Sequence, residues 1–302
     1  TEEDDVILYY KDSAVVTFTI EEANFYAEDV LIQVDGVTKA PTDWTGNGDV
    51  WTGTVTISEE GDHEVTVTYT DRSTNEMVAY RSQKIAIDRT APTIKVEYDN
   101  NTALNTNHYK ADRTATITIV DHNFRADDVL AAVTAVDVQG KPVSVTDYAA
   151  YLADRNSWTT TGDTHVATIT FSADAVYTFD IGYTDIIGNA AEDFAEQKFV
   201  VDHAKPEGLK IEDSESVGDK IIKNITFGFY QPELIVTLTA EDATAGVDYF
   251  EWVYTKESGA SDKNAQSFGA TIAAEDIVYT NDGLTAIATF KIPANARGHI
   301  SA

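Results

Sequence analysis

A segment near the start of the chain recurs about a hundred residues later, and this repeat limits the possible fold more than any other feature. Tyr9–Val30, YYKDSAVVTFTIEEANFYAEDV, aligns without a gap with His108–Val129, HYKADRTATITIVDHNFRADDV, at an offset of 99 residues (109 − 10). Further along, the offset becomes 114 (183 − 69), so the second copy carries 15 extra residues (114 − 99). Because such self-similarity marks a repeat architecture, we expect tandem copies of one small domain.

A third copy begins at an offset of 220 (230 − 10), where YQPELIVTLTAED follows the rhythm of YKDSAVVTFTIEE. The phrase IDRTAPTIKV at Ile87–Val96 is echoed by VDHAKPEGLKI at Val201–Ile211. Pro fixes φ and biases the residue before it toward extended backbone, so these phrases indicate short, stiff junctions. We predict modules at 1–90, at 91–205 with an insertion at about 131–165, and at 206–302, the last truncated at its C-terminal strands. The first module lacks an opening strand unless VILYY supplies it.

Within each copy, apolar residues alternate with Thr or another polar residue, as in AVVTFTI, TATITIV and LIVTLTA. This period of two is typical of strands with one buried face. Turn signals such as VDG and GNGD separate the strands. Short strands at this spacing, with about a hundred residues per copy, predict antiparallel β-sandwiches.

The insertion of the second copy contains VTDYAAYLADRNSW, which breaks the alternation. Thr146 or Asp147 can cap a short helix there, because their side-chain oxygens accept backbone N–H bonds. Tyr148, Tyr151 and Leu152 would share one face of that helix. We therefore expect a helical turn packed across one end of the second sandwich.

Composition limits the partners and the setting. The 302 residues include 51 acidic and 21 basic side chains, for a formal charge of −30. A field of this sign disfavours nucleic acid and anionic lipid and favours cations. No apolar run approaches the eighteen residues that indicate a membrane-spanning helix, and there is no Cys for a disulfide or thiolate site. The composition and the repeats favour an extracellular protein over an acidic cytosolic one.

No catalytic pattern stands out in the sequence. None of the six His belongs to an H-x-x-x-H pair, and no G-x-S-x-G turn is present. Adjacent carboxylates are numerous, but a chain this acidic produces them by chance, so no glycosidase-type pair can be chosen. The sequence predicts a protein that is not an enzyme and requires no cofactor.

Structural calcium is the metal hypothesis that the sequence offers. Asp88 and Asp202 lie at the module junctions, while Asp71 and Asp185 end the strand two turns earlier. Calcium takes six to eight oxygen ligands, often from converging loops. The alternative is that these residues cap turns by accepting backbone N–H bonds, and the sequence leaves both open.

The segments EANFYAEDV and DHNFRADDV lie between two strands and end clean alternation. Phe25 and Phe124 are expected to close the end of the sandwich. The next position, Tyr26 in one copy and Arg125 in the other, is a candidate ligand surface that varies between copies. Other candidates are aromatic residues of the kind that dominates protein interfaces: Tyr9, Trp44 and Trp51.

The ITIVDHNFRADDV and FTIEEANFYAEDV segments, the run from Trp158 to Asp185, the TDIIGNAA turn and the closing DRTAP and DHAKP resemble known repeats. They are similar to the bacterial immunoglobulin-like (Ig-like) modules of large, wall-anchored surface proteins of Gram-positive bacteria. The resemblance implies an all-β fold of tandem Ig-like antiparallel β-sandwiches, with a short helical insertion in the second. It also implies an extracellular place on a bacterial cell surface, anchored through regions outside this chain.

Three function classes follow from the resemblance. The first is a binding or adhesion module that engages a host protein. Immunoglobulin is one such partner, since some related surface proteins of gut commensals bind it. The second is a passive stalk, and the third is a carbohydrate-binding accessory region of a surface glycosidase. The expected partner is a host protein or a glycan, with no nucleic acid and no membrane insertion, and the modules are expected to be monomeric within a longer chain.

Overall fold

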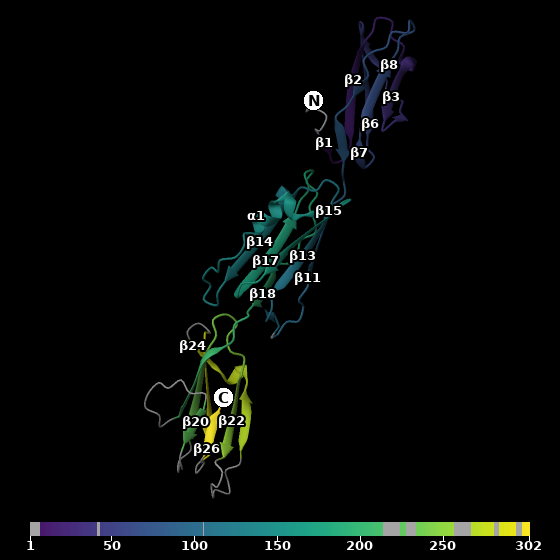
Figure 1. The fold of residues 1–302 in the computed structure, drawn as a ribbon. Coiled ribbons are helices and arrows are strands. Elements are labelled where there is room, and N and C mark those ends of the chain that lie inside the picture. The colour runs from purple at the N-terminus through teal and green to yellow at the C-terminus, as the bar shows by residue number, and fades with distance from the viewer. Residues whose placement is uncertain are drawn as a thin grey trace.

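The computed structural model describes residues 7–40, 43–104, 106–213, 224–227, 234–256, 267–280, 284–293 and 298–302. These residues form mainly strands, arranged as three sandwiches placed end to end (Figure 1). We call them modules 1, 2 and 3 in chain order. The predicted all-β fold of Ig-like antiparallel sandwiches is confirmed. None of the described helices is long and apolar enough to cross a membrane.

Module 2 has two facing sheets of four strands each. One sheet has the order β11 (Thr93–Tyr98), β13 (Arg113–Val120), β16 (Thr164–Phe171), β15 (Thr159–Thr161). The other has the order β12 (His108–Tyr109), β18 (Gln197–Val201), β17 (Ala175–Tyr183), β14 (Val129–Val136). Neighbouring strands are antiparallel except β12 and β18, which run parallel.

Module 1 repeats this plan with one long strand divided. One sheet has the order β2 (Ala14–Glu21), β6 (Val50–Ile57), β5 (Thr45–Asn47). The opposite layer contains β4 (Val37–Thr38), β3 (Val30–Val34), β8 (Val65–Tyr69), β9 (Tyr80–Arg81). It continues with β1 (Ile7–Tyr10), β10 (Lys84–Ile87), β7 (Gly61–His63). At the offset of 114, β7 and β8 together occupy the positions of β17.

The segment VILYY does not supply the opening strand that module 1 was expected to lack. Ile7–Tyr10 pairs in parallel with β10, as β12 pairs with β18 in module 2. No described strand takes the place beside β2 that β11 takes beside β13. Val16 in β2 is accordingly half-buried, whereas its counterpart Ala115 is fully buried.

Module 3 also has two sheets. One has the order β19 (Glu207–Asp213), β21 (Leu234–Glu241), β25 (Thr285–Ile292), β24 (Val278–Thr280). The other has the order β20 (Asn224–Phe227), β26 (Gly298–Ser301), β22 (Phe250–Lys256), β23 (Phe268–Ile272). This module was expected to be truncated at its C-terminal strands. Strand β26 is antiparallel to β22, as β17 is to β14. Strand β20 lies on the other side of β26.

The alternating pattern produces the cores. In β13, Ala115, Ile117 and Ile119 are fully buried, while the Thr residues between them face outward. Burying a Val, Leu or Ile side chain contributes about 1.5–3 kcal/mol, so a few such strands stabilise a sandwich. The buried apolar side chains form three separate clusters, with members from 14–87, 109–201 and 211–300.

Short helices precede strands or, in the case of the module 2 insertion, lie on the flank of the sandwich beside β14 (Val129–Val136). Three single 3₁₀ turns precede a strand: η1 (Ala27–Asp29), η2 (Ala126–Asp128) and η4 (Ala274–Asp276). The insertion of module 2 forms the α-helix α1 (Tyr148–Ala153) and the 3₁₀ turn η3 (Arg155–Ser157). The predicted helical insertion is therefore confirmed.

Asp147 caps α1, since its carboxylate accepts the N–H of Ala150 at 3.0 Å. Tyr148 and Leu152 are buried, but Tyr151 is 39% exposed and does not share their face as expected. At 3.6 residues per turn, Leu152 lies about 40° around the helix from Tyr148, whereas Tyr151 lies about 60° from Tyr148 on the other side, at the edge of the buried face.

Leu152 and Tyr151 test how far α1 contributes to the core of module 2. We expect Leu152→Ala to cost about 2–5 kcal/mol, because the fully buried side chain would leave a cavity. Tyr151→Ala is the matched control and should change stability by about 0.5 kcal/mol or less. The measurement is a denaturant titration followed by NMR signals of module 2. Equal losses in both variants would contradict this account.

Candidate functional site

Three aspartates meet where module 1 passes into module 2. Asp88 follows β10, Asp121 follows β13 and Asp185 follows β17, so each comes from the end of a different strand. One carboxylate oxygen from each lies within 4.8 Å of the others. The three residues are only 5%, 6% and 4% exposed. Among the described residues, no ion pair joins them to a Lys or Arg.

Asp88 is held by the junction itself. Its N–H donates to the carbonyl of Tyr10 at 3.1 Å, and its carboxylate accepts the N–H of Thr90 at 3.0 Å. Two side chains of module 2 also form hydrogen bonds with Asp88. Asn123 Nδ2 donates to the Asp88 carboxylate at 3.2 Å, and Asn189 Nδ2 donates to its carbonyl at 3.3 Å. Asp88 is thus both a turn cap and the bonded link between two modules.

Asp185 and Asp121 are held by their own loops. Asp185 accepts the N–H of Ile187 at 2.9 Å and that of Asn189 at 2.8 Å, which closes the TDIIGNAA turn. The side chain of Asn189 also donates to Asp185 at 2.8 Å. Asp121 accepts the hydroxyl of Tyr183 at 3.0 Å. Both carboxylates therefore face the junction from rigid positions.

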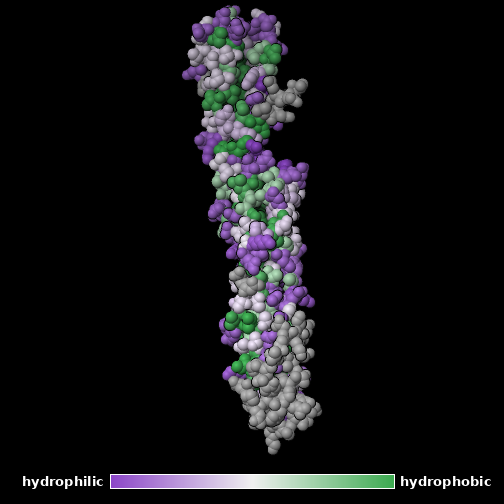
Figure 2. Space-filling model, turned by 90° about the vertical axis from the view of Figure 1, so that its left-hand side faces the viewer, coloured by the Kyte–Doolittle hydropathy of each residue, from purple (hydrophilic) through white to green (hydrophobic). Residues whose placement is uncertain are grey.

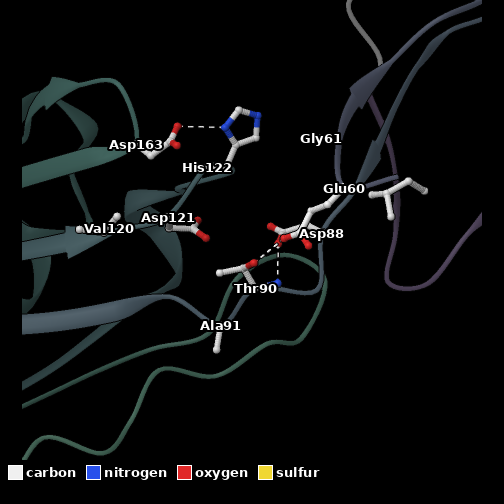
Figure 3. A pocket seen from close by; sticks show the side chains of 10 residues that line it. Glu60, Gly61, Asp88, Thr90, Ala91, Val120, Asp121, His122 and Asp163 are labelled. Carbon is white, nitrogen blue, oxygen red and sulfur yellow. Dashed lines mark hydrogen bonds and ion pairs between the residues drawn. The ribbon is translucent and has the colours of Figure 1, made fainter. Parts of the chain in front are cut away.

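A hollow of about 240 Å³ opens beside Asp88 and Asp121, lined by residues of both modules (Figure 3). His122 lies at its rim and joins the modules electrostatically: its Nδ1 is 2.9 Å from Asp163 of module 2 and its Nε2 is 3.5 Å from Asp62 of module 1. The hydrogen bond to Asp163 raises the pKa of His122. Protonated His122 therefore attracts one carboxylate from each module.

The electrostatics of the three aspartates are unfavourable when all are ionised. Burial raises the pKa of Asp121 to about 6, and the charges of Asp185 and Asp88 act in the same direction. The hydrogen bond from Tyr183 opposes this shift. A proton shared within the cluster, or a hard divalent cation with carboxylate ligands, would relieve the repulsion.

The structure brings together only two of the four aspartates predicted as metal ligands. Asp88 and Asp185 meet at the first junction. Asp202 lies at the second junction, where its carboxylate accepts the N–H of Ala245 at 3.1 Å. Burial, and then the charge of Asp242, raise the pKa of Asp202. Asp71 closes a turn with Asn75 in module 1, in the position that Asp185 has in module 2.

Asn189 was missed by sequence reasoning. Its signal was present, because the TDIIGNAA turn places an Asn four residues after Asp185. Module 1 has the same spacing between Asp71 and Asn75. The second role of Asn189, a hydrogen bond to another module, depends on how the modules meet and has no local signature.

The candidate ligand-surface residues divide into two groups. Tyr26 is 38% exposed and the guanidinium carbon of Arg72 lies 3.4 Å from its ring centroid. Arg125 is exposed at the equivalent position and lies 3.6 Å from Asp128. Both remain available at the surface.

The tryptophans of module 1 point inward instead. The rings of Trp44 and Trp51 both lie 4.8 Å from that of Phe25, one edge-on and one stacked. All three rings are half-buried, as is Tyr9 on β1. Phe124 makes the equivalent contacts in module 2 with Trp158, His165 and Tyr183. The two Phe residues therefore close the sandwich ends, as the sequence indicated.

Comparisons with known proteins add little to this description. No protein-family model matches the chain, and no curated protein sequence does. Among solved structures, the chain is similar to the FdeC adhesin of Escherichia coli at 17% identity, over 95% of this chain and 79% of that one, with a TM-score of 0.34. It is also similar to the ICAM-5 D1–D4 ectodomain at 11% identity, over 96% and 67% of the two chains, with a TM-score of 0.43.

A third similar structure is BcpA, the major pilin subunit of Bacillus cereus, at 10% identity, over 95% and 87% of the two chains, with a TM-score of 0.16. All three TM-scores lie below 0.5, and all three identities lie below 20%. The strand order of the modules defines the Ig-like fold of this chain.

The raised pKa of Asp121 predicts a pH dependence. A free aspartate has a pKa near 3.9, so the folded state binds this proton more tightly than the unfolded state. The stabilisation is complete below pH of about 4 and is lost as pH rises through about 6, where ionisation costs about 2–3 kcal/mol. We expect Asp121→Asn to be more stable than the unchanged protein at pH 8 and equal to it near pH 4.

The measurement is the melting temperature of module 2 from pH 4 to 8 in the presence of a chelator. Asp127→Asn is the control, because Asp127 is exposed on the neighbouring η2. Parallel melting curves for Asp121→Asn and the unchanged protein at every pH would show that Asp121 titrates normally.

Proposed function

We propose that the chain is a non-enzymatic segment of an extracellular bacterial surface protein, in which Ig-like modules held end to end carry a surface that adheres to a host protein. The observation that carries the proposal is the bonding across both junctions. Asn123 and Asn189 bond to Asp88 at the first, and Ala245 bonds to Asp202 at the second. Short junctions bonded in this way support an extended array, which is what projection from a cell surface requires.

Differences between the modules favour adhesion over a passive stalk. A stalk needs only interchangeable units. Here module 2 carries α1, module 1 lacks it, and the Asn-Phe loops present Tyr26 in one module and Arg125 in the other. Figure 2 shows hydrophobic residues gathered over module 1 on the face turned to the viewer. The exposed apolar residues of that module include Val15, Val37 and Val78, which are 61%, 60% and 91% exposed.

The finer proposal is that the host partner is an immunoglobulin, with a glycan as the alternative. The net charge of −30 speeds association with a basic protein surface. High salt screens this attraction, so association becomes slower as the salt concentration rises. Exposed Tyr and Arg side chains at the module ends supply the residue types that dominate interface energetics.

Binding to purified immunoglobulin tests this proposal directly. The full chain is immobilised, and intact immunoglobulin G and A and their Fab and Fc fragments are passed over it, with serum albumin as the control. We expect saturable binding of one fragment that weakens with salt and weakens further in Tyr26→Ala or Arg125→Ala. Signal on a glycan array without protein binding favours the carbohydrate alternative, and no binding in either assay favours the stalk.

We further propose that Asp88, Asp121 and Asp185 hold a calcium ion that stiffens the first junction. The support is the approach of three buried carboxylates from three strand ends, without a Lys or Arg ion pair among the described residues. Backbone carbonyls and water would complete the six to eight ligands that calcium takes. The same carboxylates then attract the ion instead of repelling one another.

Calcium should raise the melting temperature of the unchanged protein, because an ion that binds only the folded state adds RT ln(1 + [L]/Kd) to stability. Asp185→Asn should abolish that rise. Asp71→Asn is the matched control: it changes the same turn in module 1, away from the first junction, and should leave the rise intact. An equal response to calcium in all three proteins, or none in the unchanged protein, would contradict the proposal.

A further inference from the structure

Module 1 has a hollow on its flank, distinct from the junction. It has a volume of about 170 Å³ and opens between the end of β3 and the end of β6. Apolar walls come from Val34 and Ile57, and Val37 stands at the surface, 60% exposed. Thr56, Glu59 and His63 supply polar groups.

The equivalent position in module 2 shows which side chain can fill this hollow. At the offset of 114, Thr56, Ile57 and His63 correspond to Thr170, Phe171 and Tyr177 of module 2 (56 + 114, 57 + 114 and 63 + 114). The equivalent space in module 2 is filled by Tyr148 of α1. Its ring centroid lies 5.4 Å from that of Phe171, and its hydroxyl donates to the carbonyl of Thr170 at 2.5 Å.

The local geometry of the two modules agrees at this point. The hydroxyl of Tyr177 donates to the carbonyl of Ala173 at 3.1 Å. His63 Nε2 lies 2.8 Å from the carbonyl of Glu59, and Glu59 is the counterpart of Ala173 (59 + 114). A hydrogen bond between equivalent positions is thus kept although both side chains differ. The hollow of module 1 is therefore equivalent to the seat of Tyr148.

Trp44 provides a second, independent observation. In module 2 the indole Nε1 of Trp158 donates to the carbonyl of Leu152, at the C-terminal turn of α1, at 2.7 Å. Trp44 is the counterpart of Trp158 (44 + 114), and its Nε1 is buried without a hydrogen-bond partner among the described residues. A buried donor without an acceptor is unfavourable, so this N–H indicates a missing acceptor.

The two indoles have closely matching distances and interplanar angles to the Phe ring that each contacts. Trp44 lies 4.8 Å from Phe25 with an interplanar angle of 62°, and Trp158 lies 4.9 Å from Phe124, also at 62°. Module 1 therefore keeps both contact points for a helix like α1, the seat for a Tyr ring and the indole donor one turn away. Because it lacks the 15-residue insertion, it has no helix of its own to use them.

We propose that this flank of module 1, the α1-like site, binds a short helical segment of a partner protein that presents a tyrosine. The tyrosine ring enters the hollow and its hydroxyl donates to the carbonyl of Thr56. The N–H of Trp44 has almost no accessible surface in the free module, so the atoms that cover it must move aside. A main-chain carbonyl one turn later then accepts this N–H, as that of Leu152 does for Trp158. A cavity of about 150 Å³ accommodates benzene, so 170 Å³ suits one aromatic ring.

The proposal rests on the binding function proposed above and names the chemistry of the partner. The partner is recognised through a helix with Tyr at one position and a free carbonyl four residues later. This is helix-in-groove recognition with one aromatic anchor, and one anchor of this kind commonly dominates the affinity.

The test uses the full chain, labelled with ¹⁵N, and a peptide with the sequence of residues 144–157, SVTDYAAYLADRNS. We expect binding with a dissociation constant of about 0.1–1 mM, since a short peptide must order itself on binding. The indole N–H signal of Trp44 should move downfield as it gains an acceptor, while that of Trp252 in module 3 stays in place. A peptide in which Tyr148 is replaced by Ala should not bind.

Two protein variants complete the test. Val37→Trp places a bulky side chain at the mouth of the hollow and should weaken peptide binding at least about tenfold. Thr19→Trp is the matched control, because Thr19 is exposed on the outer face of β2, opposite Thr52 and away from the hollow, and should leave binding unchanged. Both sites are exposed, so the fold tolerates both changes.

An unmoved Trp44 signal, or equal shifts with the Tyr and Ala peptides, would overturn the proposal. Binding of N-acetyltyrosinamide without binding of the peptide would also overturn it, because the hollow would then recognise a free phenol and not a helix. The assay contains no immunoglobulin or glycan, so its failure is separate from failure of the proposed adhesion function.

Discussion

Each module depends on one antiparallel strand pair whose apolar face closes the sandwich: β2 with β6, β13 with β16, and β21 with β25. Alternation puts every second residue of these strands inside, where burial supplies the stabilisation, and leaves Thr outside. Everything that differs between modules is attached to this frame at its ends and flanks. The frame can therefore be copied along the chain while loops, junctions and insertions change.

The ends of the frame hold the carboxylates of the candidate site. Asp121 leaves β13, Asp185 leaves β17 and Asp88 leaves β10, so the strand ends deliver three carboxylates to one place. In one module alone, each carboxylate is a turn cap of a familiar kind. They become an unusual group only because a second module packs against the first. The junction thus combines mechanical linkage with a concentration of charge that a proton or a cation can neutralise.

Because the modules are repeats, module 2 can be used as a standard of comparison for module 1. Phe25 and Phe124 contact their aromatic neighbours in closely matching geometry. The structures around these rings can therefore be compared position by position between the two modules. Module 2 closes its flank with α1, whereas module 1 retains the Tyr seat and the Trp44 donor without the helix. In the same comparison, no described strand pairs with β2 at the place where β11 pairs with β13 in module 2.

The sequence by itself determined the strands, the repeat and the capped helix at Asp147, because period-two alternation, fixed offsets and side-chain caps are local signals. It also named Asp88 and Asp185 among four aspartates that could hold a metal, without showing that these two meet. Tertiary structure decided that Asp121 and Asn189 join them, that Asp71 and Asp202 do not, and that Trp44 and Trp51 face inward. The reason is physical: these outcomes depend on which strand ends meet across a junction and which side of a ring is covered, and neither is encoded in spacing along the chain.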